Sequence, residues 1–229
     1  MKTIGLLGGM SWESTVTYYQ VINTTVKNLL GGLHSAKILL YSVDFSEFEE
    51  RMSKGDWAGN GEALSDAARR LENAGADFLL ICTNSMHKLY DTVQSSVQVP
   101  VLHIGDVTAE TLQNNKITSV GLLGTKYTME QDFLRGRLEE RGLTVTVPGT
   151  AARERINAII FNELCLGKIE AESKKFYLEV LDKLAQEGCD AVILGCTEIG
   201  LLVSQEDTAV PLYDTTTIHA AKAAVSALE

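Results

Sequence analysis

A repeat that runs through the whole chain constrains the fold more than any other feature. Three blocks occur twice, in the same order and at a nearly constant offset: Ile4–Gly8 and Val120–Gly124, Ala74–Asn84 and Glu187–Thr197, Val99–Leu102 and Val210–Tyr213. The period is far too long for a solenoid, and it occurs only twice. The repeat therefore predicts two copies of one small domain.

Each copy alternates short apolar runs with amphipathic segments. The apolar runs suit buried parallel strands: Ile4–Leu7, Ile38–Val43, Phe78–Ile81, Val120–Leu123 and Ala191–Leu194. The segments with helical periodicity are Glu13–Leu29, Glu62–Ala74, Met129–Arg141, Arg153–Leu166 and Ala171–Glu187. Gly75, Gly142 and Gly188 stand where helices would end.

This alternation predicts an α/β fold of two similar, doubly wound parallel-sheet domains related by pseudo-twofold symmetry. We place the N-terminal half at residues 1–115, with or without the C-terminal helix 214–229, and the C-terminal half at 116–213. Ligands of such sheets bind outside the carboxyl ends of the strands, so we expect the active site in a cleft between the two domains.

The balance of charges excludes several classes of partner. The 229 residues carry a formal net charge of −10, and 45% of them are hydrophobic. An acidic protein repels phosphate backbones, and no basic cluster suggests a membrane surface, so we expect neither nucleic acid nor membrane as a partner. The first apolar run is interrupted at Gly8-Gly9, which is too early for a signal-peptide core. The four cysteines lack CxxC spacing, and we expect a cytoplasmic protein that keeps them reduced.

Small and polar residues follow four of the predicted strands. They are Gly8-Gly9-Met10-Ser11, Cys82-Thr83-Asn84-Ser85, Gly124-Thr125 and Gly195-Cys196-Thr197-Glu198. The repeat aligns Thr83 with Cys196, so these two side chains would face each other across the cleft. The first segment lacks the third glycine of a dinucleotide-binding loop, which excludes that function. It is either a tight turn alone or a turn whose N–H groups contact a small anion.

Cys196 is the strongest candidate for chemistry. It lies between a buried strand and an expected helix start, where a helix N-terminus lowers the pKa of a thiol. A cysteine can also be a small buried hydrophobe, and we favour that interpretation for Cys165 and Cys189. Because adjacent residues at a strand end point to opposite sides, Cys82 is expected to face the core if Thr83 faces the cleft.

The histidines and isolated cations give weaker signals. His34, His87, His103 and His219 have no metal-ligand spacing, so we predict no metal site. His87 lies one turn after Thr83, where it either orients site residues or is a satisfied structural histidine. On the residues alone, Arg51 and Lys168 are interpreted as solvated surface charges.

At these positions the chain resembles the aspartate/glutamate racemase family. The resemblance covers the whole chain and rests on Gly8–Thr15 (GGMSWEST), Thr83–His87 (TNSMH) and Gly195–Glu198 (GCTE). The family usually has Cys-Asn-Thr where this chain has Thr83-Asn84-Ser85, whereas Cys196 matches. This pattern is similar to the L-aspartate/glutamate-specific racemases, in which a Thr/Cys pair replaces two cysteines.

The resemblance implies a homodimeric racemase without cofactor that acts on L-Asp, L-Glu or both. It implies that Cys196 and Thr83 remove and return the α-proton from opposite faces. A thiol is a far better base than a hydroxyl near pH 7, so Cys196 would start the reaction and the L form would be preferred. The expected substrate contacts combine strand-end residues with positions carried over from the family: Met10, Ser11, Arg51, Met52, Asn84, Ser85, Thr125, Lys168 and Thr197.

Two other functions remain open. A site with one cysteine also resembles arylmalonate decarboxylases and maleate isomerases, although aromatic substrates would need a more apolar pocket than Thr, Ser and Asn provide. The second alternative is an amino-acid binding protein that lost catalysis together with the first cysteine.

Overall fold

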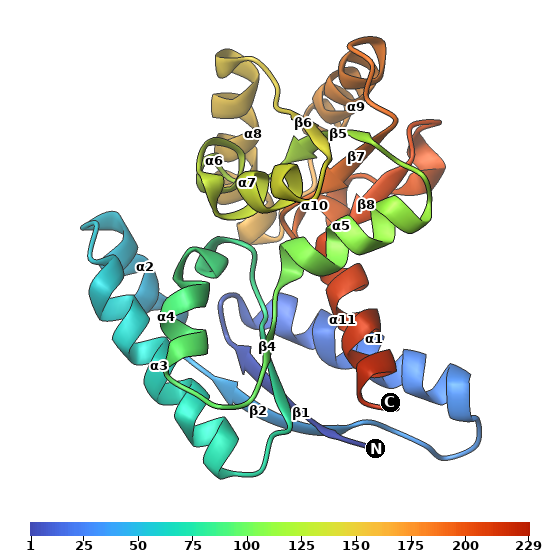
Figure 1. The fold of residues 1–229 in the computed structure, drawn as a ribbon. Helices are drawn as coiled ribbons and strands as arrows, with labels where there is room; N and C mark the ends of the chain where they lie inside the picture. Colours follow the sequence, from blue (N-terminus) through green and yellow to red (C-terminus); the bar gives the residue numbers. More distant parts are fainter. The chain divides into compact units, whose positions relative to one another are not determined.

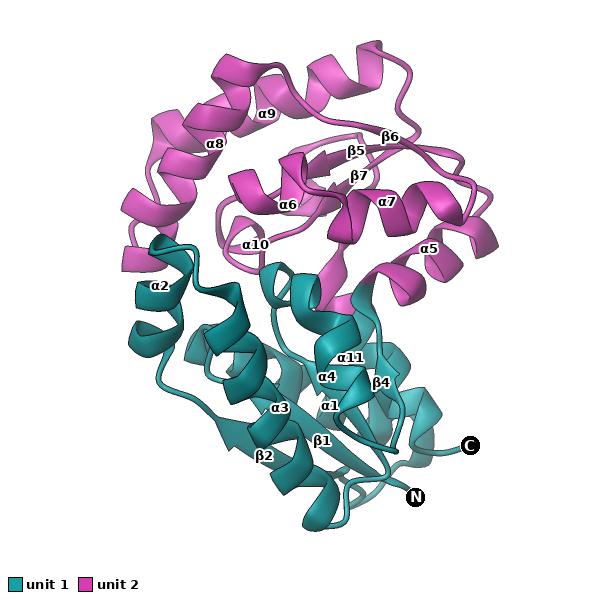
Figure 2. Cartoon of the chain, turned by 60° about the vertical axis from the view of Figure 1, so that its left-hand side comes forward, with its two compact units in different colours: residues 1–104, 219–229 teal, residues 105–218 magenta.

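The computed structural model describes residues 1–229, and its ribbon is drawn in Figure 1. The chain divides into two compact units, which Figure 2 distinguishes by colour. Unit 1 contains residues 1–104 and 219–229, and unit 2 contains residues 105–218. The chain therefore passes into unit 2 after Ile104 and returns to unit 1 at His219. The sequence-based division at 115/116 lies one helix further along the chain.

Unit 1 is built on a four-stranded parallel sheet with the strand order β2-β1-β3-β4. Its elements are β1 (Thr3–Gly8), α1 (Trp12–Leu30), β2 (Lys37–Ser42), α2 (Phe45–Ser53), α3 (Trp57–Asn73), β3 (Phe78–Ile81), the 3₁₀ segment η1 (Ser85–Leu89), α4 (Tyr90–Ser95) and β4 (Val101–Leu102). The last helix, α11 (Thr215–Ser226), begins in unit 2 and continues into unit 1.

Unit 2 repeats the plan with the strand order β6-β5-β7-β8, again all parallel. Its elements are α5 (Ile104–Asn114), β5 (Ser119–Leu123), α6 (Lys126–Glu130), α7 (Asp132–Glu140), β6 (Thr144–Thr146), α8 (Thr150–Asn162), η2 (Leu164–Leu166), α9 (Ala171–Gln186), β7 (Ala191–Leu194), α10 (Ile199–Leu202), η3 (Gln205–Asp207) and β8 (Leu212–Asp214). The predicted α/β fold of two similar parallel-sheet domains is confirmed.

Equivalent residues of the repeat make equivalent contacts. The carboxylate of Asp77 accepts a hydrogen bond from the backbone N–H of Thr3 at 2.5 Å. The carboxylate of Asp190 accepts one from the N–H of Ser119 at 3.0 Å, at the matching start of β5. Each aspartate therefore ties the first residue of one central strand, β1 or β5, to the turn that precedes the neighbouring strand, β3 or β7.

The C-terminal helix completes the core of unit 1. On one face of the sheet, Ile4 and Leu80 pack with α1 residues and with four alanines of the C-terminal segment: Ala220, Ala223, Ala224 and Ala227. Cys82 belongs to the same cluster and is fully buried. Because alanine side chains are short, α11 can approach the sheet closely. This packing assigns residues 219–229 to unit 1.

Two predicted helices differ in the structure. The segment predicted as one helix at Met129–Arg141 forms α6 and α7, because Gln131 is extended (φ −105°, ψ 152°) and ends the first helix. The segment predicted at Arg153–Leu166 ends as α8 at Asn162, and the 3₁₀ segment η2 follows it. No helix of the chain is both long enough and apolar enough to cross a membrane.

Candidate active site

In unit 1, the carboxyl end of β1 leads into a tight turn. Gly9 has φ +90°, and its N–H donates a hydrogen bond to Thr15 Oγ1 at 2.8 Å. Ser11 caps α1 by accepting from the N–H of Ser14 at 3.3 Å, and Met10 is buried beside it. The N–H of Gly9 is therefore used inside the protein, which favours the tight turn over the anion site that the sequence left open.

The carboxyl end of β3 adjoins that turn, because Leu7 and Ile81 are register partners in neighbouring strands. Thr83 and Ser85 are half-buried, and their hydroxyl oxygens lie 3.4 Å apart. Asn84 is buried between them. The structure thus brings Met10 and Ser11 to the same edge of the sheet as these three residues.

Cys82 faces the core, as predicted. It is fully buried, and burial raises the pKa of its thiol far above the ordinary value. Because the Cys82 side chain has no exposed surface, it cannot contact a ligand, and its thiol is also hard to ionise. The register that pairs Thr83, rather than Cys82, with Cys196 is consistent with this burial.

Arg51 and Met52 lie on α2, a helix that the sequence analysis did not anticipate. Met52 is buried, while the guanidinium of Arg51 lies 3.6 Å from the Glu47 carboxylate and 5.7 Å from the centre of the Phe48 ring. One guanidinium nitrogen, Nη1, is buried without a hydrogen-bond partner. Arg51 is therefore not a simple surface charge, since it keeps a donor for an acidic ligand.

In unit 2, Thr125 follows β5 and caps α6 through a hydrogen bond from the N–H of Thr128 at 3.4 Å. Lys168 follows η2, and its side chain is exposed. No hydrogen bond or salt bridge joins its ammonium group to the residues at the carboxyl ends of the strands. The structure therefore leaves Lys168 on the surface of unit 2.

Cys196 lies at the carboxyl end of β7 and is half-buried. Its Sγ donates a hydrogen bond to Glu198 Oε2 at 2.9 Å. Burial, the negative charge of Glu198 and this hydrogen bond together raise the pKa of the thiol well above its usual value. The sequence analysis expected the opposite direction from a helix N-terminus. The following helix, α10, has only four residues, so burial and the adjacent carboxylate dominate.

Neighbouring polar residues complete this strand end. Thr197 Oγ1 lies 3.3 Å from Thr216 Oγ1, at the start of α11. Asp214, at the end of β8, is half-buried, and burial raises the pKa of its carboxyl group, with a further contribution from Glu198. Glu198 thus lies beside the thiol, and its charge also acts on Asp214.

Sequence reasoning missed three residues here: Glu198, Asp214 and Tyr177. Glu198 stands in the quoted GCTE motif, two residues after the cysteine, so its position was a usable signal. Asp214 and Tyr177 carried no such signal, because only the fold brings Asp214 within electrostatic reach of Glu198 and Tyr177 within that of Cys196. Tyr177 is fully buried with no hydrogen-bond partner for its hydroxyl, and burial and the charges of Cys196 and Glu163 raise its pKa.

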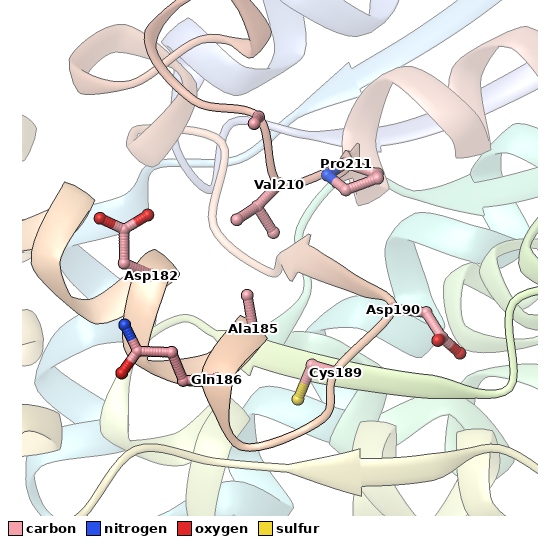
Figure 3. A pocket seen from close by; sticks show the side chains of 8 residues that line it. Asp182, Ala185, Gln186, Cys189, Asp190, Val210 and Pro211 are labelled. Atoms are coloured by element: carbon pink, nitrogen blue, oxygen red, sulfur yellow. The ribbon is translucent and has the colours of Figure 1, made fainter.

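The surface hollow drawn in Figure 3 is a different feature. It has a volume of about 440 Å³ and is lined by residues of α9 and of the segments before β7 and β8. Cys189 and Asp190 mark its position at the amino end of β7, whereas ligands of parallel sheets bind at the carboxyl ends. This hollow is therefore not the candidate site.

Comparisons with known proteins find relatives that match most or all of the chain. The family model for Asp/Glu/hydantoin racemases matches residues 7–223. The crystal structure of a candidate Asp/Glu racemase from Yersinia pestis is 52% identical over the full length of both chains, with a TM-score of 0.96. An aspartate racemase homologue from Pyrococcus horikoshii is 36% identical over both full chains, with a TM-score of 0.89. A broad specificity amino-acid racemase from Bacillus subtilis is 23% identical over 214 residues, which is 92% of each chain.

Proposed function

Because the chain belongs to the Asp/Glu/hydantoin racemase family and is thus an isomerase of small amino-acid substrates, we propose that it racemises aspartate or glutamate, with preference for the L form. The observation that carries the proposal is the position of Cys196. Its thiol lies half-buried at the carboxyl end of β7, equivalent in the repeat to Thr83 at the end of β3. No cofactor takes part in the proposed reaction.

The proposed reaction moves one proton at a time. The Cys196 thiol first passes its proton to the Glu198 carboxylate, to which it is already hydrogen-bonded at 2.9 Å. The resulting thiolate removes the α-proton of the L acid, and the electron pair left on the α-carbon is delocalised into the α-carboxylate. Thr83 then donates its hydroxyl proton to the opposite face of the carbanion and is reprotonated from solvent, while Glu198 releases its proton to solvent and Cys196 retains the α-proton as a thiol.

Substrate binding would make the first step easier. An isolated thiol with a raised pKa is mostly protonated at neutral pH, so the free site is a poor base. The ammonium group of an amino acid bound beside the Cys196 sulfur would stabilise the thiolate and lower the pKa of the thiol. The thiolate would then form mainly when the substrate is bound.

The substrate carboxylates would be held by neutral donors and by Arg51. Asn84, Ser85, Thr125 and Thr197 supply hydroxyl or amide groups at the strand ends, and the unpartnered Nη1 of Arg51 supplies a charged one. Such fixed donors stabilise the charge that develops on the α-carboxylate. Contacts of the substrate with Met10, Ser11 and Met52, an additional contact from Lys168, a homodimeric state and a cytoplasmic location remain part of the proposal by family resemblance.

The direct experiment follows α-proton exchange of L-Asp and L-Glu in D₂O by NMR, together with optical rotation to detect racemisation. We expect both signals with the wild-type protein and neither with a folded Cys196→Ser variant. A protein that binds these acids without exchange would instead be an amino-acid binding protein. Cys82→Ala is the matched control, because it removes the thiol at the end of β3, which is buried in the core of unit 1; it should retain both signals.

A further inference from the structure

Three histidines and two tyrosines form a buried cluster in unit 1. We call it the histidine cluster; its members are Tyr18, His87, Tyr90, His103 and His219. The ring centres of His87 and His103 lie 4.8 Å apart, and those of His87 and His219 lie 5.7 Å apart. All three histidines are buried. None of them has a role in the reaction proposed above.

The hydrogen bonds of His87 determine which ring nitrogen carries the proton. Its Nε2 accepts a hydrogen bond from the backbone N–H of Ile104 at 3.2 Å, so Nε2 holds no proton. The neutral ring therefore carries its proton on Nδ1, which lies 2.7 Å from the carbonyl oxygen of Thr83. His87 thus donates to the backbone of Thr83, a proposed catalytic residue, and accepts from the backbone of Ile104, which belongs to a distant segment.

His219 contacts the ring of His87 edge-on. Its Nε2 lies 2.9 Å from the carbonyl oxygen of Leu102, an acceptor, so Nε2 carries the proton. Its Nδ1 then accepts from the hydroxyl of Tyr18 at 2.8 Å. Burial and the neighbouring His87 lower the pKa of His219 to about 3, so this ring stays neutral at physiological pH.

The cluster also lies at both points where the chain passes between the units. Ile104 is the last residue of unit 1 before the chain enters unit 2, and His219 is the first residue after its return. One histidine therefore bonds the outgoing segment, and another belongs to the returning segment. The Thr83 carbonyl is connected to both through the ring of His87.

We infer that His87 is a positioning residue that fixes Thr83 by donating Nδ1–H to its carbonyl oxygen, while Nε2 anchors the chain at Ile104. The inference rests on the proposed function, because it assigns His87 to the proton-return step. Fixing the carbonyl restricts the backbone that carries the Thr83 hydroxyl. A hydroxyl is a weaker proton donor than a thiol. The proton-return step therefore depends more strongly on where the Thr83 hydroxyl lies relative to the α-carbon than it would for a cysteine.

Two conservative substitutions separate the two bonds of His87. In His87→Asn, the side-chain amide can reach the position of Nδ1 and donate to Thr83, but it loses the bond to Ile104. In His87→Gln, the longer side chain can reach the position of Nε2 and accept from Ile104, but it loses the bond to Thr83. Each variant loses one of the two buried hydrogen bonds, so their losses in the free energy of unfolding should be similar. A difference in activity between them therefore does not come from a difference in stability.

The deciding measurement is the ratio of racemisation to α-proton exchange with L-Asp or L-Glu in D₂O. Cys196 starts exchange without Thr83, whereas racemisation needs Thr83 to return the proton. We expect His87→Gln to lower the ratio by on the order of 10²-fold, the size of effect that a small misplacement can have. His87→Asn should keep the wild-type ratio. Equal ratios in the two variants, or exchange and racemisation falling together in both, would overturn the inference.

A second measurement separates this inference from the proposed function. Backbone amide exchange of residues 83–87 should quicken in His87→Gln but not in His87→Asn, since only Gln releases the Thr83 carbonyl. Long-range ¹H–¹⁵N NMR should find the proton of wild-type His87 on Nδ1. If the wild-type protein racemises neither acid, these two results still decide the matter: equal amide exchange in both variants, or a proton on Nε2, would refute the positioning role.

Discussion

The charge of Glu198 contributes to the raised pKa of the Cys196 thiol, on which the proposed reaction depends. The pKa of Cys196 is raised first by burial and then by the carboxylate of Glu198, which also accepts the thiol hydrogen bond. Replacing this carboxylate by a neutral amide removes the repulsion between two negative charges. The thiolate should then form more easily.

We therefore predict that Glu198→Gln lowers the pKa of Cys196, although burial still holds it above the ordinary value. The measurement is the pH dependence of iodoacetamide alkylation at Cys196, resolved by peptide mass spectrometry from the other cysteines. The reaction at a fixed pH should become faster in the variant. At the same time racemisation should slow, because the group that receives the thiol proton is gone. An unchanged alkylation profile would show that Glu198 does not act on the thiol.

At the scale of elements, Gly9 joins β1 to α1 through a turn that excludes a side chain. Its φ is +90°, and a Cβ placed there would lie 2.6 Å from the backbone nitrogen of Val43. Gly75, which ends α3, has a similar φ of +97°, but no atom lies within 4 Å of its would-be Cβ. The two positions differ in crowding and not in backbone conformation.

This difference gives a prediction for unfolding in denaturant. Gly75→Ala should cost about 1–2 kcal/mol, the price of a left-handed backbone for an L residue. Gly9→Ala should cost more, because the backbone of Val43 must also move. Equal losses in the free energy of unfolding would mean that the close approach to Val43 is readily relieved.

The elements also show what sequence patterns can predict. The central strands were predictable because buried parallel strands are continuous apolar runs, and β3 and β7 match the predicted residues at both ends. Helix α2 was missed because it is short and mostly polar, although Phe48 and Met52 share one buried face and Asp44 caps it. The two- and three-residue edge strands β4, β6 and β8 are too short to have a periodicity.

Within the site, the repeat predicted the position of Cys196 but not its acidity. Alternation along a strand distinguishes Cys82 from Thr83, and that distinction is local. The pKa of Cys196 depends on burial and on the direction of the Glu198 side chain, and neither can be deduced from a four-residue motif. The partners of His87 lie 4 and 17 residues away, so only the fold brings Ile104 to its ring.

At the scale of the whole molecule, the buried His219 connects stability to pH. Its pKa falls from an ordinary value of 6.5 to about 3 on folding. Between these values the unfolded chain binds a proton that the folded protein does not, so acid favours unfolding. The contribution of neutral His219 to the free energy of unfolding is fully present above pH 6.5. It is lost as the pH falls towards 3, by up to about 1.4 kcal/mol per pH unit.

We predict that His219→Gln reduces this pH dependence by the equivalent of one proton, measured by denaturant unfolding between about pH 6.5 and 5, above most carboxyl pKa values. The variant should be less stable than the wild type at pH 7, because the buried hydrogen bond between the Tyr18 hydroxyl and His219 Nδ1 is lost. His34→Gln, at an exposed position, is the control and should leave the pH dependence unchanged. If the slope of the His219 variant equals that of the wild type, His219 does not stay neutral in the folded protein.

We propose that Thr83 and Cys196 act on opposite faces of one α-carbon, and the Thr83→Cys substitution tests this pairing most directly. The substitution restores the two-thiol pair that is usual in the family and supplies a second base that can ionise near neutral pH. A well-placed general base contributes about 10²–10⁴-fold, so D-Asp or D-Glu should become a good substrate for proton exchange. The L-to-D rate should rise as well, because the enantiomers have equal free energies and kcat/KM must be the same in both directions.

The measurement is the initial rate of racemisation and of α-proton exchange, from each enantiomer of aspartate and glutamate, with wild-type and Thr83→Cys protein. We predict that exchange from the D acids rises far more than exchange from the L acids, and that racemisation increases in both directions. A folded Thr83→Cys protein with no gain in racemisation of either acid would contradict the facing pair.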